Sequence, residues 1–171
     1  MTAFDLQRNI EIVDEQQQKL RFGSFDYSDA LQLGMQIIEE AKNSFHNPVS
    51  VRIDIDGVTA FYHLMDGTNL GNDWWMRKKL NGSQITGDSS FMNYLKIIEG
   101  DKKESFPWVK DEGSFAAVGG CFPITLINGK PKGFAMVSGL PHYQDHQLLV
   151  NSLSNFTGIK VPDILWDNSD K

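Results

Sequence analysis

The sequence has very little cysteine and no long apolar run. Cys121 is the single cysteine among 171 residues, so an intrachain disulfide is excluded. No segment approaches the roughly 20 apolar residues that a membrane-spanning helix needs. Residues 1–8 lack the basic start and the apolar run of a secretory signal. These absences predict a cytoplasmic protein with no membrane partner, since an unpaired thiol fits a reducing compartment.

Positive charge is also scarce. The chain has 16 Lys and Arg against 22 Asp and Glu, a net charge of −6. Binding to nucleic acid requires clustered positive charge, so we expect no nucleic-acid partner. The one dense basic patch consists of Arg77, Lys78 and Lys79. A patch of this size can hold one carboxylate or phosphate, although a solvated helix face has the same pattern.

Nothing in the chain marks a domain boundary. Repeats, linkers and low-complexity tracts are absent, and the length suffices for one hydrophobic core. We therefore expect a single domain over residues 1–171, with an N-terminal helix over residues 5–19. Residues 160–171 lack periodicity and form a tail, whose Ile164 and Trp166 can dock on the body or on a neighbouring subunit.

The clearest local pattern is a β-hairpin. Alternating apolar residues over 49–55 and again over 58–65 flank an Asp-Gly pair, which supplies the positive φ angles of a tight turn. This turn predicts a register with Ile53 beside Ala60. The same register leaves His63 on the opposite, partly aromatic face of the sheet.

The remaining elements are shorter or less regular. Their predicted ranges are a strand over 20–25, a helix over 29–44, a helix from 72 or 73 to 86, a helix from 89 or 90 to 99, a second hairpin over 122–127 and 133–137, and a last helix from 141 to 158. This order predicts an α+β fold around an antiparallel sheet, with helices on both sheet faces.

Three segments together resemble a known family. They are Asn72–Lys79 (NDWWMRKK), Gly119–Pro123 (GGCFP) and Ser138–His146 (SGLPHYQDH). They resemble the uncharacterised bacterial and fungal branch of the haem-degrading-domain superfamily, which includes HbpS-like and GlcG-like haem-binding proteins. The resemblance runs from about residue 20 to residue 158. One departure is His142, because the branch usually has another polar residue there, so His142 inherits no family role.

The resemblance carries expectations about fold and partners. It implies a profilin-like three-layer α/β/α fold with a five-stranded antiparallel sheet. It also implies assembly into homo-oligomers and suggests haem as a ligand. Since similarity of fold does not carry chemistry with it, the cofactor otherwise stays unknown.

One polar and aromatic constellation is a candidate ligand site. The helix beginning near Asn72 is the next element able to cover the sheet face that bears His63, and it brings two Trp and the basic patch. The Asp145-His146 pair lies in the opening turn of the last helix, where free amides favour an anion, and belongs to the family motif. The candidate ligand-binding residues are His63, Trp74, Trp75, Arg77, Lys78, Ser138, Asp145 and His146.

Each of these residues also has a purely structural interpretation. His63 can be a satisfied, half-buried histidine, the Trp pair can be core packing, and Asp145 can cap its own helix. The four-residue spacing of His142 and His146 suits a metal, but a third ligand is lacking, so we expect no metal site. Gly119-Gly120 is too short for a phosphate-binding loop and indicates a close backbone approach or a bulge.

Three functions remain open. The leading one is a non-catalytic, oligomeric small-ligand-binding or accessory protein for haem or another anionic planar molecule. The second is an enzyme with His146 or His63 as general acid or base and Arg77 as anion anchor, which must converge on one cavity. The third is a structural oligomeric interaction module, in which the helix around Trp74 and the tail at Trp166 make subunit contacts.

Overall fold

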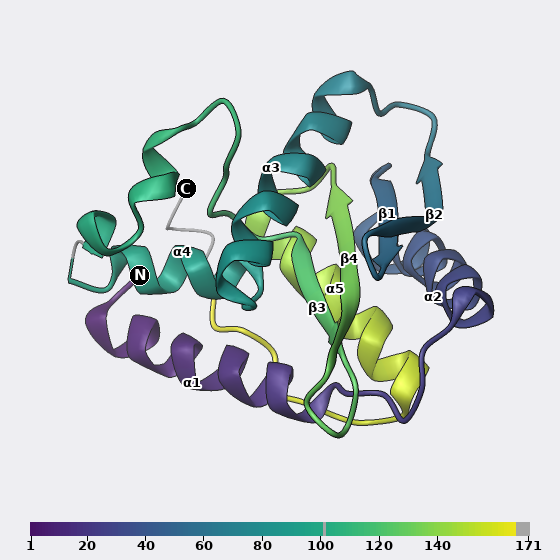
Figure 1. Ribbon diagram of the computed structural model, residues 1–171, viewed down its shortest axis with the longest axis horizontal. Helices are drawn as coiled ribbons and strands as arrows, with labels where there is room; N and C mark the ends of the chain where they lie inside the picture. Colours follow the sequence, from purple (N-terminus) through teal and green to yellow (C-terminus); the bar gives the residue numbers. More distant parts are fainter. Residues whose placement is uncertain (101, 167–171) are drawn as a thin grey trace.

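The fold is built on an antiparallel sheet with the strand order β2-β1-β4-β3 (Figure 1). The computed structural model describes residues 1–100 and 102–166, and this sheet has four strands within that part of the chain. The strands are β1 (Ser50–Ile55), β2 (Val58–Leu64), β3 (Cys121–Thr125) and β4 (Pro131–Ser138).

Helices cover both faces of the sheet. α2 and α5 pack on one face, α3 packs on the other, and α1 and α4 lie together beside the β3 edge (Figure 1). The helices are α1 (Ala3–Lys19), α2 (Tyr27–Glu40) with a π-helical turn (Ala41–Phe45), α3 (Leu70–Thr86), α4 (Ser90–Ile98) and α5 (His142–Thr157), and two short 3-10 helices span Lys102–Ser105 and Pro107–Lys110. Within the described chain, no helix is both long and apolar enough to cross a bilayer.

Side-chain caps set where several of these helices begin. Thr2 caps α1, which therefore begins at Ala3 instead of Asp5. Asn69 caps α3, and Asn72 completes the capping box from inside the helix, so the expected start at residue 72 or 73 is wrong. Ser89 accepts a hydrogen bond from the amide of Met92 and starts α4 as predicted.

The prediction of a five-stranded sheet is wrong. Residues 20–25, expected to form the fifth strand, make only an isolated bridge between Phe22 and Leu126. Phe22 and Phe25 are buried, and their ring centroids lie 4.8 Å apart. The chain then enters α2 at once, because Asp26 caps that helix. Because both rings are buried and α2 begins directly afterwards, residues 20–25 are too short to pair with β3 along a full strand. The fold is therefore α+β with four strands.

The first hairpin forms at the predicted turn but with a different register. Ile55 pairs with Val58 as expected, but Ile53 pairs with Phe61 because a bulge skips Ala60. Beyond the bulge, every β2 side chain lies on the face opposite to the predicted one. His63 therefore lies on the α2 side of the sheet, and the prediction that it faces α3 is wrong.

Packing against α2 explains the bulge. Phe61 lies against Gly34, where an added Cβ would be 2.5 Å from the ring. The largest core fills the space between the sheet and α2 and α5, and includes Leu33, Ile37, Val51, Ile53, Phe122, Leu149 and Leu153. A smaller core lies under α3 and consists of Met76, Leu80, Cys121 and Met136, with Phe134 packed against it.

Candidate functional site

The three segments that carry the resemblance meet at a buried ion pair. Lys79 of α3 places its Nζ 2.9 Å from Oδ2 of Asp145 in α5 and 3.0 Å from the carbonyl oxygen of Val137. Both charged side chains are only 3% exposed. Removal of either partner would strand a charge in the interior, so the pair fixes α3 against the start of α5.

The Gly119-Gly120 segment passes directly over this ion pair. A Cβ on Gly120 would lie 2.5 Å from Lys79 Nζ and 2.6 Å from the Val137 carbonyl oxygen, and its φ of 121° is one that side chains disfavour. A Cβ on Gly119 would overlap the His142 carbonyl oxygen. The predicted close backbone approach is therefore confirmed.

Asp145 is held on both of its oxygens. Oδ1 accepts a hydrogen bond from the amide of Leu140, and Oδ2 accepts one from Lys79. Burial raises the pKa of Asp145, although the Lys79 charge and the amides of Leu140 and Gly139 act in the opposite direction. The carboxylate thus ends the turn before α5 and balances the Lys79 charge.

His142 is a half-buried neutral histidine beside this ion pair. Its Nδ1 accepts a hydrogen bond from the amide of Gly119 at 3.2 Å, so the neutral ring carries its proton on Nε2. Burial and, to a smaller extent, the Lys79 charge lower the pKa of His142 to about 4. The ring packs edge-on against Tyr94 and Trp166, with centroids 4.7 and 5.3 Å away.

His146 lies one helical turn further on and is fully buried. Its Nε2 is 2.9 Å from Oε1 of Gln16, which can only accept, so Nε2 carries the proton. The ring stacks on Phe91 with centroids 4.7 Å apart. Burial lowers the pKa of His146 to about 3. His146 is not among the lining residues of the groove and pockets described below, and its contacts with Gln16 and Phe91 tie α5 to α1 and α4.

A groove lies between α3, α4 and residues 109–118. We call it the Trp75 groove, and its volume is about 600 Å³. Two hydrogen bonds hold residues 109–118 against α3. The Ala116 amide donates to the Lys78 carbonyl oxygen, and the Asn81 side chain donates to the Ser114 carbonyl oxygen. The groove is lined by Trp75, Lys78, Tyr94, Ile97, Ile98, Val109, Lys110, Glu112, Phe115, Ala116, Ala117 and Val118.

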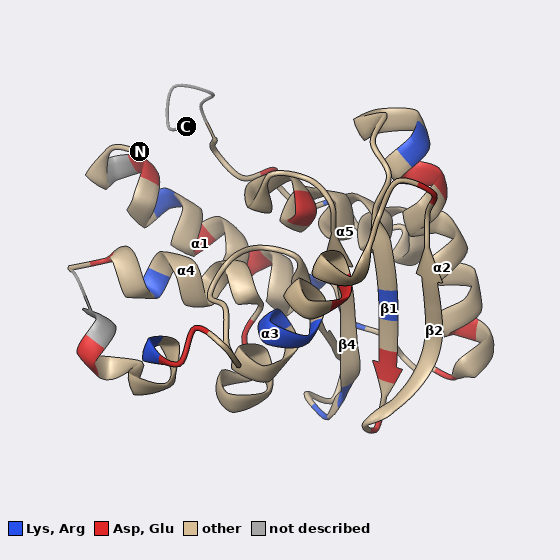
Figure 2. Ribbon diagram, turned by 90° about the horizontal axis from the view of Figure 1, so that it is seen from above, with Lys and Arg blue, Asp and Glu red and all other residues tan. Residues whose placement is uncertain are grey.

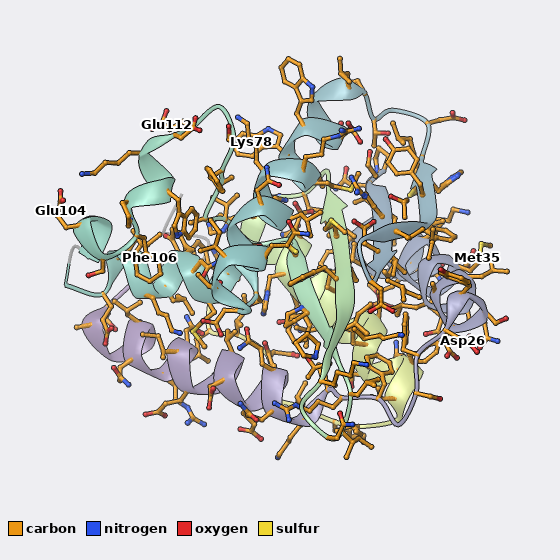
Figure 3. All side chains as sticks on the ribbon, in the orientation of Figure 1. Asp26, Met35, Lys78, Glu104, Phe106 and Glu112 are labelled. Carbon is orange, nitrogen blue, oxygen red and sulfur yellow. The ribbon has the colours of Figure 1, made fainter. Side chains whose placement is uncertain are left out.

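Trp75 and Lys78 form one wall of the groove. The Trp75 side chain is 47% exposed, and Lys78 Nζ lies 5.1 Å from the centre of its ring, within cation-π distance. Figure 3 shows Lys78 on the side of α3 that faces the segment carrying Glu112. Lys78 belongs to the block of basic residues on α3 that Figure 2 shows beside the sheet. The groove therefore combines aromatic and aliphatic walls with positive charge at its edge.

A smaller pocket of about 230 Å³ adjoins the groove. We call it the Asp145 pocket; it is lined by Trp75, Lys79, Val118, Ser138, Leu140, His142 and Asp145. Trp75 and Val118 line both spaces. The two spaces are therefore adjacent, with Trp75 and Val118 between them.

Arg77 and Trp74 face a separate hollow of about 400 Å³, which Lys78 shares with the groove. Arg77 is already engaged, since its Nε lies 2.7 Å from Oδ2 of the buried Asp73. Tyr62 donates a 2.8 Å hydrogen bond to the other oxygen of Asp73. The bulge thus turns Tyr62, and not His63, towards α3.

The predicted site residues therefore separate into groups. Trp75, Ser138 and Asp145 line one pocket, Trp74, Arg77 and Lys78 line the hollow on α3, His146 is buried, and His63 is exposed on the opposite face of the sheet. The enzyme hypothesis requires His146 or His63 to share a cavity with Arg77. Among the described residues, neither histidine lines a cavity with Arg77. They also contain no group of three metal-ligating side chains.

Several residues of the site are not among the predicted ones. The sequence pattern places Lys79 only in the basic patch with Arg77 and Lys78, and it predicts no element over residues 109–118. The only available signal was the apolar run Phe115–Val118 within that segment. Residues 160–166 of the expected tail are described, and Trp166 docks on the body by stacking on Tyr143 with centroids 4.5 Å apart. Residues 167–171 of the tail lie outside the described residues.

Comparisons with known proteins agree with this architecture. The family described as "Haem degrading protein HbpS-like" matches residues 25–154. A UPF0303 protein of Yersinia pseudotuberculosis is 29% identical over 160 residues, covering 94% of this chain and 93% of its own length. A UPF0303 protein of Yersinia enterocolitica is also 29% identical, with coverages of 94% and 95%.

Solved structures show the same fold. The Ybr137w protein superposes with a TM-score of 0.79 at 28% identity, covering 87% of each chain. The PduOC haem complex gives 0.65 at 18% identity, covering 83% of this chain and 99% of its own. A variant of Streptomyces reticuli HbpS gives 0.61 at 19% identity, covering 77% and 86%. At these lower identities the last two show likeness of fold alone.

Proposed function

This chain belongs to the HbpS-like family of haem-degrading proteins, and we propose that it is a ligand-binding or accessory protein that holds a planar anionic molecule in the Trp75 groove. The observation that carries the proposal is the composition of that groove. Its walls are the Trp75, Tyr94 and Phe115 rings and aliphatic side chains, and Lys78 and Glu112 are its charged lining residues besides Lys110, which is paired with Glu104. Flat apolar faces bind by stacking and burial, and a carboxylate can pair with Lys78.

Haem is the ligand that the family suggests, since a solved neighbour is a haem complex. Its flat ring and carboxylates suit the groove, but histidine ligation of its iron does not suit these residues. His146 is buried against Gln16, and Nδ1 of His142 is occupied by the Gly119 amide while Nε2 carries the proton. The other two histidines, His46 and His63, are exposed and are not among the groove's lining residues. Binding therefore rests on the ring faces and carboxylates and does not require iron.

Titration with haemin and with metal-free protoporphyrin IX tests this proposal. We expect saturable binding of both, followed by absorbance and by Trp fluorescence, with Kd values within about threefold of each other because neither ring is ligated. Trp75→Ala is expected to weaken both by about tenfold or more, the equivalent of about 1.4 kcal/mol. Lys78→Gln is expected to weaken both less, with an effect that shrinks at high salt.

Ile85→Ala is the control, since Ile85 is 55% exposed on the same helix but does not line the groove. It should leave both affinities unchanged. The absence of saturable binding by either porphyrin, or equal binding by wild type and Trp75→Ala, would refute the assignment. Binding of haemin alone would show that iron ligation, and not the groove, holds the ligand.

We also propose that the chain forms homo-oligomers through the start of α3. Leu70 and Trp74, one helical turn apart, are 64% and 59% exposed, and large exposed apolar neighbours of this kind mark interfaces. Light scattering should report a smaller mass for a Leu70→Ser, Trp74→Ala double variant. Ile127→Ser, at a 70% exposed residue after β3, is the control. An unchanged mass in the double variant would remove this surface from consideration.

A further inference from the structure

The Asp145 pocket contains two polar groups without a partner in the described chain. These groups are Oγ of Ser138 and Nε2 of His142, for which the structure gives no hydrogen bond. Neither atom is among the fully enclosed polar atoms without a partner, and both residues line the pocket. The pocket therefore offers a hydroxyl, which can donate or accept, and an imidazole N–H, which donates.

The charges of this pocket are already balanced. Lys79 is paired with Asp145 at 2.9 Å, and the other Asp145 oxygen is taken by the Leu140 amide. A carboxylate entering here would meet the Asp145 carboxylate without an uncompensated cation. The low pKa of His142, about 4, keeps its ring neutral at neutral pH. A neutral acceptor, such as a carbonyl oxygen, meets no such repulsion and can accept from His142 and from Ser138.

We infer that the Asp145 pocket is a specificity subsite for a neutral carbonyl or amide edge of the ligand, whose flat ring lies on Trp75 and whose carboxylate lies by Lys78. This inference rests on the proposed function of the groove. At about 230 Å³ the pocket is smaller than usual sites for whole ligands, which begin near 300 Å³, so it holds one part of the molecule. Trp75 and Val118 line both spaces and join them. The ligand class is thus a planar aromatic carboxylate that also carries an amide-type edge.

A matched pair of probes separates the subsite from the groove. Quinoline-4-carboxylate has a flat ring and a carboxylate, and 2-oxo-1,2-dihydroquinoline-4-carboxylate adds only the lactam N–H and carbonyl. Isothermal titration of the wild-type chain is expected to give about tenfold tighter binding of the lactam, because a site built to hydrogen-bond a group discriminates against its absence. Ser138→Ala and His142→Gln, made singly, are each expected to reduce that preference by about threefold or more, with little change for the quinoline.

The outcomes distinguish the two proposals. Equal binding of both probes to the wild type, or a preference that survives in both variants, would overturn the subsite while leaving the groove assignment in place. Binding of neither probe would overturn the groove assignment for aromatic carboxylates and the subsite with it. Lys78→Gln serves as the control, since it should weaken both probes by the same factor and keep their ratio. Ser138→Ala removes only one hydroxyl, so this variant still tests the subsite if His142→Gln does not fold.

Discussion

Acidification is expected to destabilise this fold through His142 and His146, which are kept neutral by burial. Their pKa values in the folded chain are about 4 and about 3, against 6.5 for an exposed histidine. As the pH falls below 6.5, the unfolded chain takes up protons at both rings and the folded chain does not. The stability contributed by these residues is therefore complete above pH 6.5 and is lost progressively towards the two folded-state values.

The size of the effect follows from the two pKa values. Each pH unit between the unfolded and folded pKa is worth about 1.4 kcal/mol per group. Because the unfolded ring is already half protonated at pH 6.5, each histidine removes about 2 kcal/mol between pH 6.5 and about pH 4.5, and the two together about 4 kcal/mol. Asp145 acts in the opposite direction, because its pKa is raised by burial and protonation there favours the folded chain. This loss is a large share of the free energy of unfolding, which is about 5 to 15 kcal/mol for a typical domain.

Urea unfolding at pH 7 and at about pH 4.5 measures this loss. In His146→Leu the loss between the two pH values should be smaller than in the wild type by about 2 kcal/mol, whatever the change in absolute stability. His63→Leu is the matched control, because that ring is exposed on the other side of the sheet. A loss in His146→Leu as large as in the wild type would refute the reasoning, since it would mean that this buried ring is not the acid-sensitive group.

Other substitutions test the contacts that surround the site, each by urea unfolding at neutral pH. Gly120→Ala should cost about 2 to 4 kcal/mol through a positive φ and overlap with Lys79, whereas Gly129→Ala, with open space around it, should cost about 1 kcal/mol; equal costs would refute the close approach. Lys79→Met should cost about 3 to 5 kcal/mol and regain most of it when Asp145→Leu is added; additive losses would argue against the ion pair. Trp166→Ala should cost about 1 to 3 kcal/mol through lost ring contacts, and no change would mean that the tail is not docked.

Features governed by adjacent residues were predictable from the sequence. The Asp56-Gly57 turn has the expected positive φ angles of 50° and 80°, and Ser89 caps α4 as expected. In each case the deciding chemistry lies within a few residues. The α3 start was misplaced for a related reason, because Asn69 and Asn72 are both capable caps and only the folded capping box distinguishes them.

Features that depend on distant packing were not predictable. The bulge at Ala60 follows from the fit of Phe61 against Gly34 on another element, and it reverses the face on which His63 lies. The expected fifth strand fails because Phe22 is drawn into the core. Lys79 looked like a surface lysine, since its partner Asp145 lies 66 residues away in the sequence.

The residues that carry the family resemblance divide between those that hold the fold and those that line the proposed ligand site. Lys79, Gly120 and Asp145 are enclosed and hold α3, β3 and α5 together, so their chemistry is occupied by the fold. Trp75 and Lys78 of the first segment form one wall of the groove. The irregular residues 109–118 form another wall, whose position is set by two hydrogen bonds and by Trp108 packing on Gly82. A change in those walls can alter the ligand without disturbing the ion pair. Chains that share the three motifs and differ in residues 109–118 are therefore expected to bind different planar molecules.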